Sequence, residues 1–324
     1  MKVTNNNALS FSYAIIVFLF SVIVFEFFTL GDQYHYSKYY LELKDYEDIL
    51  MAFLMYTRAL STTEPGYFIV TYISSKYLYL DKYLLVSLIN SILAFVVCSL
   101  LLRVRVNRFL VFFLIFFNFY LFVLYFSAER LKFALLFFAI AIYIEKGKLA
   151  YFLMAVSILF HSQMILFVYC YFILNFNVGN YLRYSNKSDL VIKFFLLMLL
   201  IVVFLYMFPH IQNKLAGYSA INMSFDELIK PAVFGFLILY YSGFKQVKWF
   251  FLVLPFLVVS YFTGGERLVF ILYFFLVYLL VKNKRELTPL NLLLTAYFSY
   301  KGIGFIYNIF AYGDGFNSAG ITSF

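Results

Sequence analysis

Charged residues are scarce in this 324-residue chain, at 13%, whereas 65% of the residues are hydrophobic and 24% are aromatic. Soluble domains contain roughly 25% charged residues and about half apolar ones. The scarcity of charge leaves no room for a large polar domain and indicates an integral membrane protein. At roughly 20 residues per helical crossing, the apolar residues are sufficient for about ten spans.

Alternation of apolar and polar residues, which marks the strands of a membrane β-barrel, is also missing. The segment FLVFFLIFFNFYLFVLYF (109–126) is apolar almost throughout. We therefore expect an all-α integral membrane protein, a polytopic helical bundle of about 10 to 12 transmembrane helices with one sizeable outer loop.

Cysteines and metal-binding motifs are equally sparse. The two cysteines, Cys98 and Cys170, lie inside apolar segments, so the sequence supports neither a disulfide framework nor a thiolate metal site. The chain has no HExxH, CxxC or DxD motif, and Gly264-Gly265 lacks the rest of a phosphate-binding loop. We expect no metal, no cofactor and no soluble nucleotide-sugar donor.

The net charge of +9 comes largely from short linkers between apolar segments. Lys and Arg are retained on the cytoplasmic side of membrane proteins, so we place these linkers inside, together with Lys2. The basic linkers contain Arg103, Arg105 and Arg108; Lys146 and Lys148; Arg183 and Lys187; Lys245 and Lys248; and Lys282, Lys284 and Arg285. Topology thus accounts for the positive charge, and we expect no nucleic-acid partner.

With these linkers inside, the apolar segments predict eleven crossings in a single transmembrane domain, 1–324. The predicted spans are about 8–30, 83–102, 109–126, 131–144, 149–160, 162–175, 191–209, 231–243, 249–262, 268–281 and 289–311. The acidic, tyrosine-rich stretch 31–65 would lie outside. The next segment, 66–80, is short for a crossing, so we assign it to the outer interface as an amphipathic or half-inserted helix. Residues 31–82 would then form the outer-face loop with its interfacial helix.

Ionisable residues gather at the outer boundary of this topology. Arg130, His161 and Arg267 fall at the outer ends of their spans, although none of them was used to orient the chain. Asp32 and Glu64, at the two ends of the outer loop, lie at the same boundary. A charge at bilayer depth costs at least about 2.5 to 3.5 kcal/mol and usually marks a pathway, an ion pair or a substrate site.

The two arginines open their spans in the same dipeptide, Glu129-Arg130 and Glu266-Arg267. A cation at a helix start opposes the macrodipole, so we expect an anionic partner. The neighbouring glutamates would make surface ion pairs worth about 0 to 1 kcal/mol, whereas a phosphate would match the planar guanidinium fork. Lys132 either extends to the lipid headgroups or joins the same polar cluster.

His161 and the outer loop suggest chemistry of their own. Histidine titrates near neutrality, so His161 is able to transfer a proton, with a structural hydrogen bond as the alternative. Tyrosines and acids interleave in the loop, and such surfaces suit carbohydrate rings; an interfacial aromatic belt is the alternative. The loop tyrosines are Tyr34, Tyr36, Tyr39, Tyr40, Tyr46 and Tyr67, and the acids are Asp32, Glu42, Asp45 and Asp48.

Several short motifs occur in an order that resembles the EpsG family, whose members resemble Wzy-type bacterial polysaccharide polymerases. They are Asp32 with Tyr36; Glu64, Gly66 and Tyr67; Arg130 with Ala134; Phe160-His161; and Glu266-Arg267. The resemblance covers about residues 10–285. Leu131 stands where family members often have glutamine, and Lys132 is also unusual.

The resemblance implies a metal-independent glycosyltransferase in the bacterial plasma (inner) membrane, with its active site facing the periplasm or cell exterior. It would transfer a glycan chain from polyprenyl diphosphate to a lipid-linked acceptor repeat, as in O-antigen or exopolysaccharide synthesis. Whether a chain-length regulator binds is left open. In the implied site, Arg130 and Arg267 stabilise the diphosphate, and His161 or Glu64 is the base. The expected substrate-binding residues are Asp32, Tyr36, Tyr67, Lys132 and Glu266.

Three other functions are considered. An O-antigen-type ligase would use the same donor and similar arginines. A lipid-linked-glycan transporter would carry polar residues along the depth of its spans, whereas these midplanes are nearly free of charge, with Glu26 closest to an exception. A sugar acyltransferase would need polar residues on the inner loops, which carry mainly topological Lys and Arg.

Overall fold

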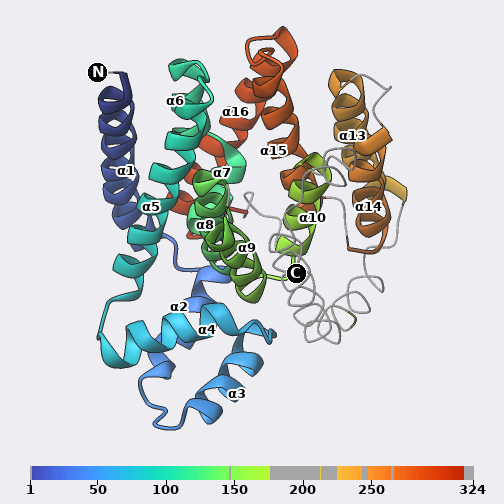
Figure 1. Cartoon of the computed structure of the whole chain (residues 1–324). Coiled ribbons are helices and arrows are strands. Elements are labelled where there is room, and N and C mark those ends of the chain that lie inside the picture. The colour runs from blue at the N-terminus through green and yellow to red at the C-terminus, as the bar shows by residue number, and fades with distance from the viewer. Residues whose placement is uncertain are drawn as a thin grey trace. The chain divides into compact units, whose positions relative to one another are not determined.

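A computed structural model shows helices joined by short turns in the part of the chain that it describes, with no strand there (Figure 1). The described residues are 2–145, 147–175, 212, 225–242, 247–263 and 266–316. They divide into two compact units, Met1–His161 with Leu292–Phe324, and Ser162–Asn291.

The first unit contains most of the long helices. Its elements are α1 (Lys2–Phe27), α2 (Asp32–Leu43), α3 (Ile49–Leu60), α4 (Pro65–Tyr72), the π-helical turn η1 (Ile73–Tyr77), α5 (Lys82–Arg103), α6 (Arg108–Phe116), α7 (Phe119–Phe126), α8 (Glu129–Ile144), α9 (Lys148–Phe160) and α16 (Pro289–Tyr312). The second unit contains α10 (Met164–Asn175), the 3-10 turn η2 (Phe225–Leu228), α13 (Ile229–Ser242), α14 (Val247–Thr263) and α15 (Glu266–Lys282).

Two of these helices are long and apolar enough to cross a membrane, Asn6–Phe27 within α1 and Lys82–Arg103. A third span is obtained if the bent pair α6 and α7 is counted as one. This is compatible with a helical membrane protein. Helices occupy the predicted spans except 191–209, which lies outside the described residues. The count of eleven crossings stays a prediction.

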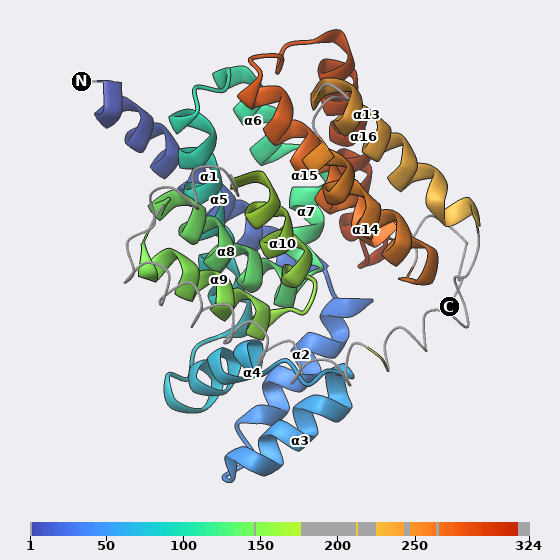
Figure 2. The ribbon, with the colours of Figure 1, turned by 45° about the vertical axis from the view of Figure 1, so that its right-hand side comes forward.

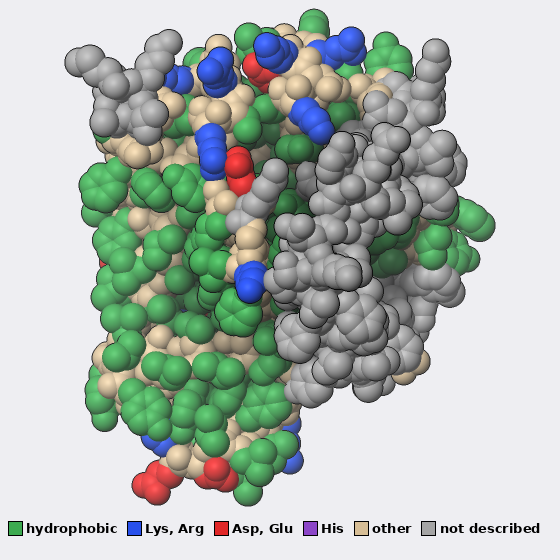
Figure 3. Space-filling model, in the orientation of Figure 1, with side chains coloured by type: hydrophobic (Ala, Val, Ile, Leu, Met, Phe, Trp, Pro, Cys, Tyr) green, Lys and Arg blue, Asp and Glu red, His purple; other side chains and the backbone are tan. Residues whose placement is uncertain are grey.

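The surface along α1 and α5 has the pattern that a bilayer requires. Large apolar side chains are exposed on both helices, among them Phe11 (61%), Leu19 (56%) and Ile92 (45%). Figure 3 shows hydrophobic side chains over most of this surface, with charged side chains gathered toward its two ends and Lys and Arg most numerous at the upper end. Apolar exposure of this extent is unfavourable in water and favourable against lipid.

A polar contact lies inside the packing of α1 and α5. Asn90 of α5 donates from its amide to Ser21 of α1 at 3.0 Å and to the backbone carbonyl of Tyr125 at 2.9 Å. The ring of Phe25 in α1 stacks on that of Tyr83 in α5, with centroids 5.6 Å apart. These contacts fix the register of α1, α5 and α7.

The predicted span 109–126 is not one straight helix. The structure divides it into α6 and α7, which are bent by 44° at Phe117 and Asn118. The cause is local, because the Asn118 side chain accepts from the backbone N–H groups of Tyr120 and Leu121 at 3.0 and 3.3 Å. A side chain that caps a new helix competes with continuation of the old one.

The predicted outer loop is also mostly helical. Figures 1 and 2 show α2, α3 and α4 gathered at one end of α1, α5 and α8. The predicted helix at 66–80 is present as α4 and η1, and its buried side chains include Tyr67, Phe68 and Tyr72. Its assignment to the membrane interface stays a prediction. The loop is a folded layer, not an open connection.

Close packing of α16 depends on Gly302. A Cβ at this position would overlap the backbone carbonyl oxygen of Phe117, at the break between α6 and α7. Only a residue without a side chain allows this approach. Gly304, two residues later on α16, has no neighbour within 4 Å of such a Cβ.

We expect Gly302→Ala to destabilise the folded protein by about 1 to 3 kcal/mol, because the backbone of Phe117 has to move. Gly304→Ala is the matched control and should leave stability unchanged or raise it by up to about 1 kcal/mol, because alanine favours a helix more than glycine does. Thermal unfolding of the purified proteins in detergent would measure both. Equal melting temperatures for the two variants would contradict this account of the packing.

Candidate functional site

Two carboxylates are fully buried where α8 begins. Glu129 is the first residue of α8, and Glu64 precedes α4. Both side chains are 0% exposed, and each lies beside a cation. An ionised carboxylate without a partner is too costly to bury, so the cations account for this placement.

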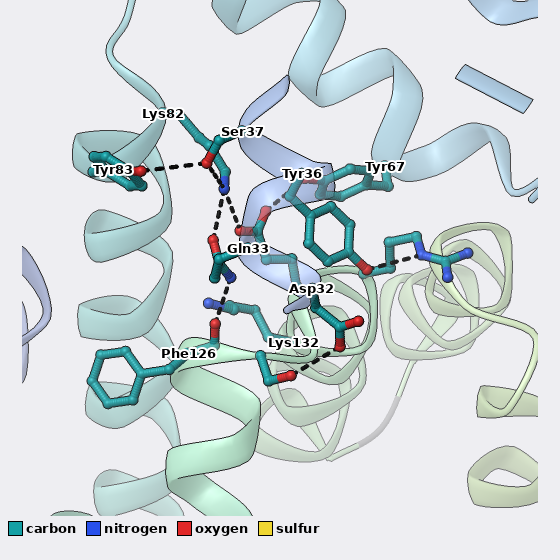
Figure 4. Close-up of polar contacts among 12 residues, drawn as sticks. Asp32, Gln33, Tyr36, Ser37, Tyr67, Lys82, Tyr83, Phe126 and Lys132 are labelled. Carbon is teal, nitrogen blue, oxygen red and sulfur yellow. Dashed lines mark hydrogen bonds and ion pairs between the residues drawn. The ribbon is translucent and has the colours of Figure 1, made fainter. Parts of the chain in front are cut away.

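The first network surrounds Glu129. The ammonium of Lys82 lies 3.0 Å from one carboxylate oxygen, and the Tyr67 hydroxyl donates to the other at 2.6 Å. Lys82 also donates to Gln33 at 2.7 Å and to Ser37 at 3.0 Å, as Figure 4 shows. This network therefore joins α2, α4, α5 and α8.

The second network surrounds Glu64. Arg130, the second residue of α8, donates to one oxygen of Glu64 at 2.7 Å and to the hydroxyl of Tyr36 at 3.3 Å. The Nδ1 atom of His161 lies 3.8 Å from the other oxygen of Glu64. The side chains of Arg130 and His161 are 15% and 14% exposed, so both reach the edge of the buried cluster.

Local sequence explains how Glu64 reaches this position. Proline at 65 begins α4 and holds the preceding residue in an extended conformation, with Glu64 at φ −73° and ψ 108°. A Cβ on Gly66 would lie 2.6 Å from the ring of Phe160, the residue before His161. Glycine at 66 thus allows α4 to pack against the end of α9 and brings Glu64 beside His161.

The tyrosines of the site are hydrogen-bond donors and acceptors, not acids. Burial raises the pKa of Tyr36, with the Arg130 charge opposing, and raises the pKa of Tyr67 well above its ordinary value, with the Glu129 charge adding to the effect. Both hydroxyls therefore stay protonated at neutral pH. Tyr67 is then a permanent donor to Glu129.

Of the two anionic partners considered for Arg130, the adjacent Glu129 is not the one that the structure shows. Glu129 pairs with Lys82, and Arg130 pairs with Glu64 from another helix. Successive residues on an α-helix point about 100° apart, so neighbours do not face each other. The two ion pairs are also buried, not exposed at a surface.

Lys82 was not among the predicted site residues. One signal could have revealed it, because Lys82 is the first residue of α5 and opposes the helix macrodipole in the same way as Arg130. Asp81 caps this helix, accepting from the backbone N–H of Leu84 at 3.0 Å.

Two further predicted residues, Lys132 and Asp32, occupy contrasting positions. The Lys132 side chain is fully buried, donates to the carbonyl of Tyr125 and lies over the ring of Phe25, so it does not extend to the lipid headgroups. Asp32 is exposed at the start of α2 and accepts from the Ser127 hydroxyl at 3.0 Å. Asp32 is accessible to a ligand in this structure, and Lys132 is not.

Arg267 and Glu266 stand at the start of α15 in the second unit. Their side chains lie outside the part of the chain that the structure describes. The predicted convergence is thus seen for Arg130, His161 and Glu64, and the contribution of Arg267 and Glu266 stays a prediction.

The networks lie at the opposite end of α5 from its basic terminus. Lys82 is the first residue of this helix and Arg103 the last, which separates them by roughly 30 Å at 1.5 Å per residue. This length matches the hydrocarbon thickness of a bilayer. The buried cluster and the exposed Arg103, Arg105 and Arg108 therefore belong to opposite ends of a membrane-length helix.

The arrangement is suited to binding an anion and moving a proton. A guanidinium and an imidazole share one buried carboxylate, and both reach the cluster's edge. Within the described ranges, no three His, Cys, Asp or Glu side chains are grouped as metal ligands.

Comparison with known proteins does not assign the chain to a family. No protein-family model matches it, and neither a curated protein nor a solved structure matches it. The function therefore has to be argued from the site.

We expect Lys82→Met to lower the free energy of unfolding by about 3 to 5 kcal/mol, because Glu129 would be left buried without its cation. Arg103→Met is the control, since the Arg103–Glu145 pair is about half exposed, at 46% and 60%, and should contribute about 0 to 1 kcal/mol. Denaturant unfolding in detergent would compare them. A loss no larger for Lys82→Met than for Arg103→Met would show that Glu129 does not need this partner.

Proposed function

We propose that this protein is a membrane glycosyltransferase that polymerises polyprenyl-diphosphate-linked oligosaccharide repeat units at the outer face of the bacterial plasma membrane. The observation that carries the proposal is the meeting of Arg130, Glu64 and His161. These residues come from three separate segments, and two of them reach the edge of a buried polar cluster.

The chemistry of the transfer fits this arrangement. The acceptor hydroxyl attacks the anomeric carbon of the donor, a new glycosidic bond forms, and the bond to the diphosphate oxygen breaks with its electron pair leaving on the diphosphate. Negative charge thus develops on the leaving group, where a fixed guanidinium stabilises it. Arg130 supplies this charge, and Arg267 is proposed as a second cation.

The acceptor hydroxyl also has to lose a proton. His161 or Glu64 is close enough to the arginine to take it as the general base. Asp32, exposed near the same helix start, is positioned to accept hydrogen bonds from a sugar. Tyr36 and Tyr67 support this site indirectly, because Tyr36 holds Arg130 and Tyr67 holds Glu129.

The proposed topology puts the site on the outer face. With the basic linkers inside and eleven crossings, the start of α5 and the start of α8 lie outside. The separation of Lys82 from Arg103 along α5 supports this assignment. A substrate flipped across the membrane would meet the site there, with its lipid in the bilayer.

A ligase that moves finished glycan to another acceptor would use the same leaving group. The site does not favour it over a polymerase, and the two differ in the product that accumulates when the gene is deleted. Loss of a polymerase leaves single repeats, whereas loss of a ligase leaves full-length lipid-linked chains.

We expect a strain without this gene to lose the ladder of surface glycan on a gel and keep a single-repeat band. The intact protein should restore the ladder. Arg130→Ala should fail to restore it, with at least a 100-fold loss of polymer on the order expected for removing an electrostatic stabiliser. Arg130→Lys should restore little, because an ammonium lacks the planar fork.

Arg108→Ala is the control for these variants, since Arg108 is exposed at the basic end and contacts Asn6 at 3.4 Å. It should restore a normal ladder. Immunoblots of membranes would confirm equal amounts of each variant. An intact ladder in the deletion strain, or normal polymer with Arg130→Ala, would overturn the proposal.

A further inference from the structure

We infer that Glu64 is the positioning residue of a His161 base, and that a diphosphate bound at Arg130 shifts Glu64 from Arg130 to His161. This inference rests on the proposed function and settles which of the two groups takes the proton. In this arrangement, His161 acts as a base only when the donor is bound.

The distances show that Glu64 interacts unequally with its two neighbours. One oxygen is 2.7 Å from Arg130, a short charge-assisted hydrogen bond, whereas the other is 3.8 Å from Nδ1 of His161, beyond hydrogen-bond range. A movement of roughly 1 Å would close the second contact to hydrogen-bond length. The ion pair with Arg130 keeps the carboxylate of Glu64 from making the hydrogen bond to His161.

Burial separates the roles of the two candidate bases. The Glu64 side chain is 0% exposed and that of His161 is 14% exposed. An acceptor hydroxyl therefore meets the imidazole and not the carboxylate. Because Nδ1 faces Glu64, we assign receipt of the proton to the other ring nitrogen, Nε2.

The surroundings of Glu64 favour movement of its side chain alone. Its backbone carbonyl accepts from the Tyr56 hydroxyl of α3 at 2.9 Å, and Gly66 packs against Phe160. The titratable and charged groups that face its carboxylate include Tyr56 of α3, Arg130 of α8 and His161 after α9, and Tyr36 of α2 accepts from Arg130. Both tyrosines have a pKa raised by burial and stay neutral.

Glu64 is the carboxylate that pairs with Arg130 in the described part of the chain. The nearby carboxylate of Glu129 is held by Lys82 and Tyr67, so it does not replace Glu64. A diphosphate at Arg130 would therefore compete with Glu64 directly. Once the diphosphate neutralises the charge of the Arg130 guanidinium, Glu64 is attracted to the imidazole of His161, which lies on the other side of Glu64.

The proton transfer then balances without another reactant. His161 keeps its proton on Nδ1, donated to Glu64, and takes the acceptor proton on Nε2. The acceptor oxygen bonds to the anomeric carbon, and the diphosphate leaves with the electron pair, held by Arg130. The imidazolium that forms is stabilised by Glu64, as in other carboxylate–histidine pairs.

The test observes the tautomer of His161 by nitrogen-15 NMR of the full chain in detergent micelles, with labelled histidine. The chain has only three histidines, and His161→Gln identifies the signal of interest. At about pH 8, where histidine is neutral, inorganic pyrophosphate serves as the probe of the diphosphate site. We expect it to move the Nδ1 signal of His161 into the protonated range.

Two variants make the result specific. In Glu64→Gln, pyrophosphate should leave the tautomer unchanged, because no carboxylate accepts from Nδ1. In Arg130→Gln, the Nδ1–H tautomer should already dominate without pyrophosphate, because the ion pair that draws Glu64 toward Arg130 is removed. The second variant keeps the test valid if Glu64→Gln fails to fold.

The outcomes separate this inference from the proposed function. If pyrophosphate binds but gives the same tautomer response in the wild type and Glu64→Gln, Glu64 does not position His161. The inference is then wrong, while the proposed function is unaffected. The inference is also wrong, again without affecting the proposed function, if His161 has the same tautomer in Arg130→Gln as in the wild type without pyrophosphate. If pyrophosphate alters no signal of the wild type, the diphosphate site at Arg130 falls as well, and the proposed function loses its support.

Discussion

Glu64 and Glu129 are carboxylates held out of water, and the architecture of the first unit follows from the cations that they require. Lys82 connects α5 to α8, and Arg130 connects α8 to α4. Removing either partner would leave a charge in a medium that solvates it poorly. The layer formed by α2, α3 and α4 is therefore joined to α8 by one buried ion pair, and α8 is joined to the membrane-length helix α5 by the other.

The sequence predicts the helices of this protein better than their breaks. The long apolar run 83–102 predicts α5 (Lys82–Arg103) to within one residue at each end, whereas the predicted span 8–30 matches α1 (Lys2–Phe27) less closely. Such runs predict helices because a backbone in lipid has to make its hydrogen bonds within each helix. The bend between α6 and α7 depends instead on one side chain, Asn118, within an otherwise uniform apolar run. Hydropathy cannot distinguish a residue that caps a helix from one that merely interrupts it.

For the candidate site, the sequence indicated some of the residues that meet near the start of α8 but not how they pair. Arg130, His161 and Glu64 were singled out because each lies at one boundary of the predicted topology, and the structure brings these three together. The partner of Glu129 was missed, since Lys82 lies 47 residues away and no local spacing relates the two. Contacts between distant helices depend on how the bundle packs, which a single sequence does not specify.

The order of the letters in the Glu129-Arg130 dipeptide has a consequence of its own. The two side chains leave α8 in different directions and meet environments of opposite sign, Lys82 on one side and Glu64 on the other. Reversing the dipeptide would conserve composition, net charge and hydropathy, yet would set cation against cation and carboxylate against carboxylate. The first turn of α8 therefore presents a carboxylate on one side and a guanidinium on the other. Each of these two residues can change during evolution only together with the residue that it pairs with.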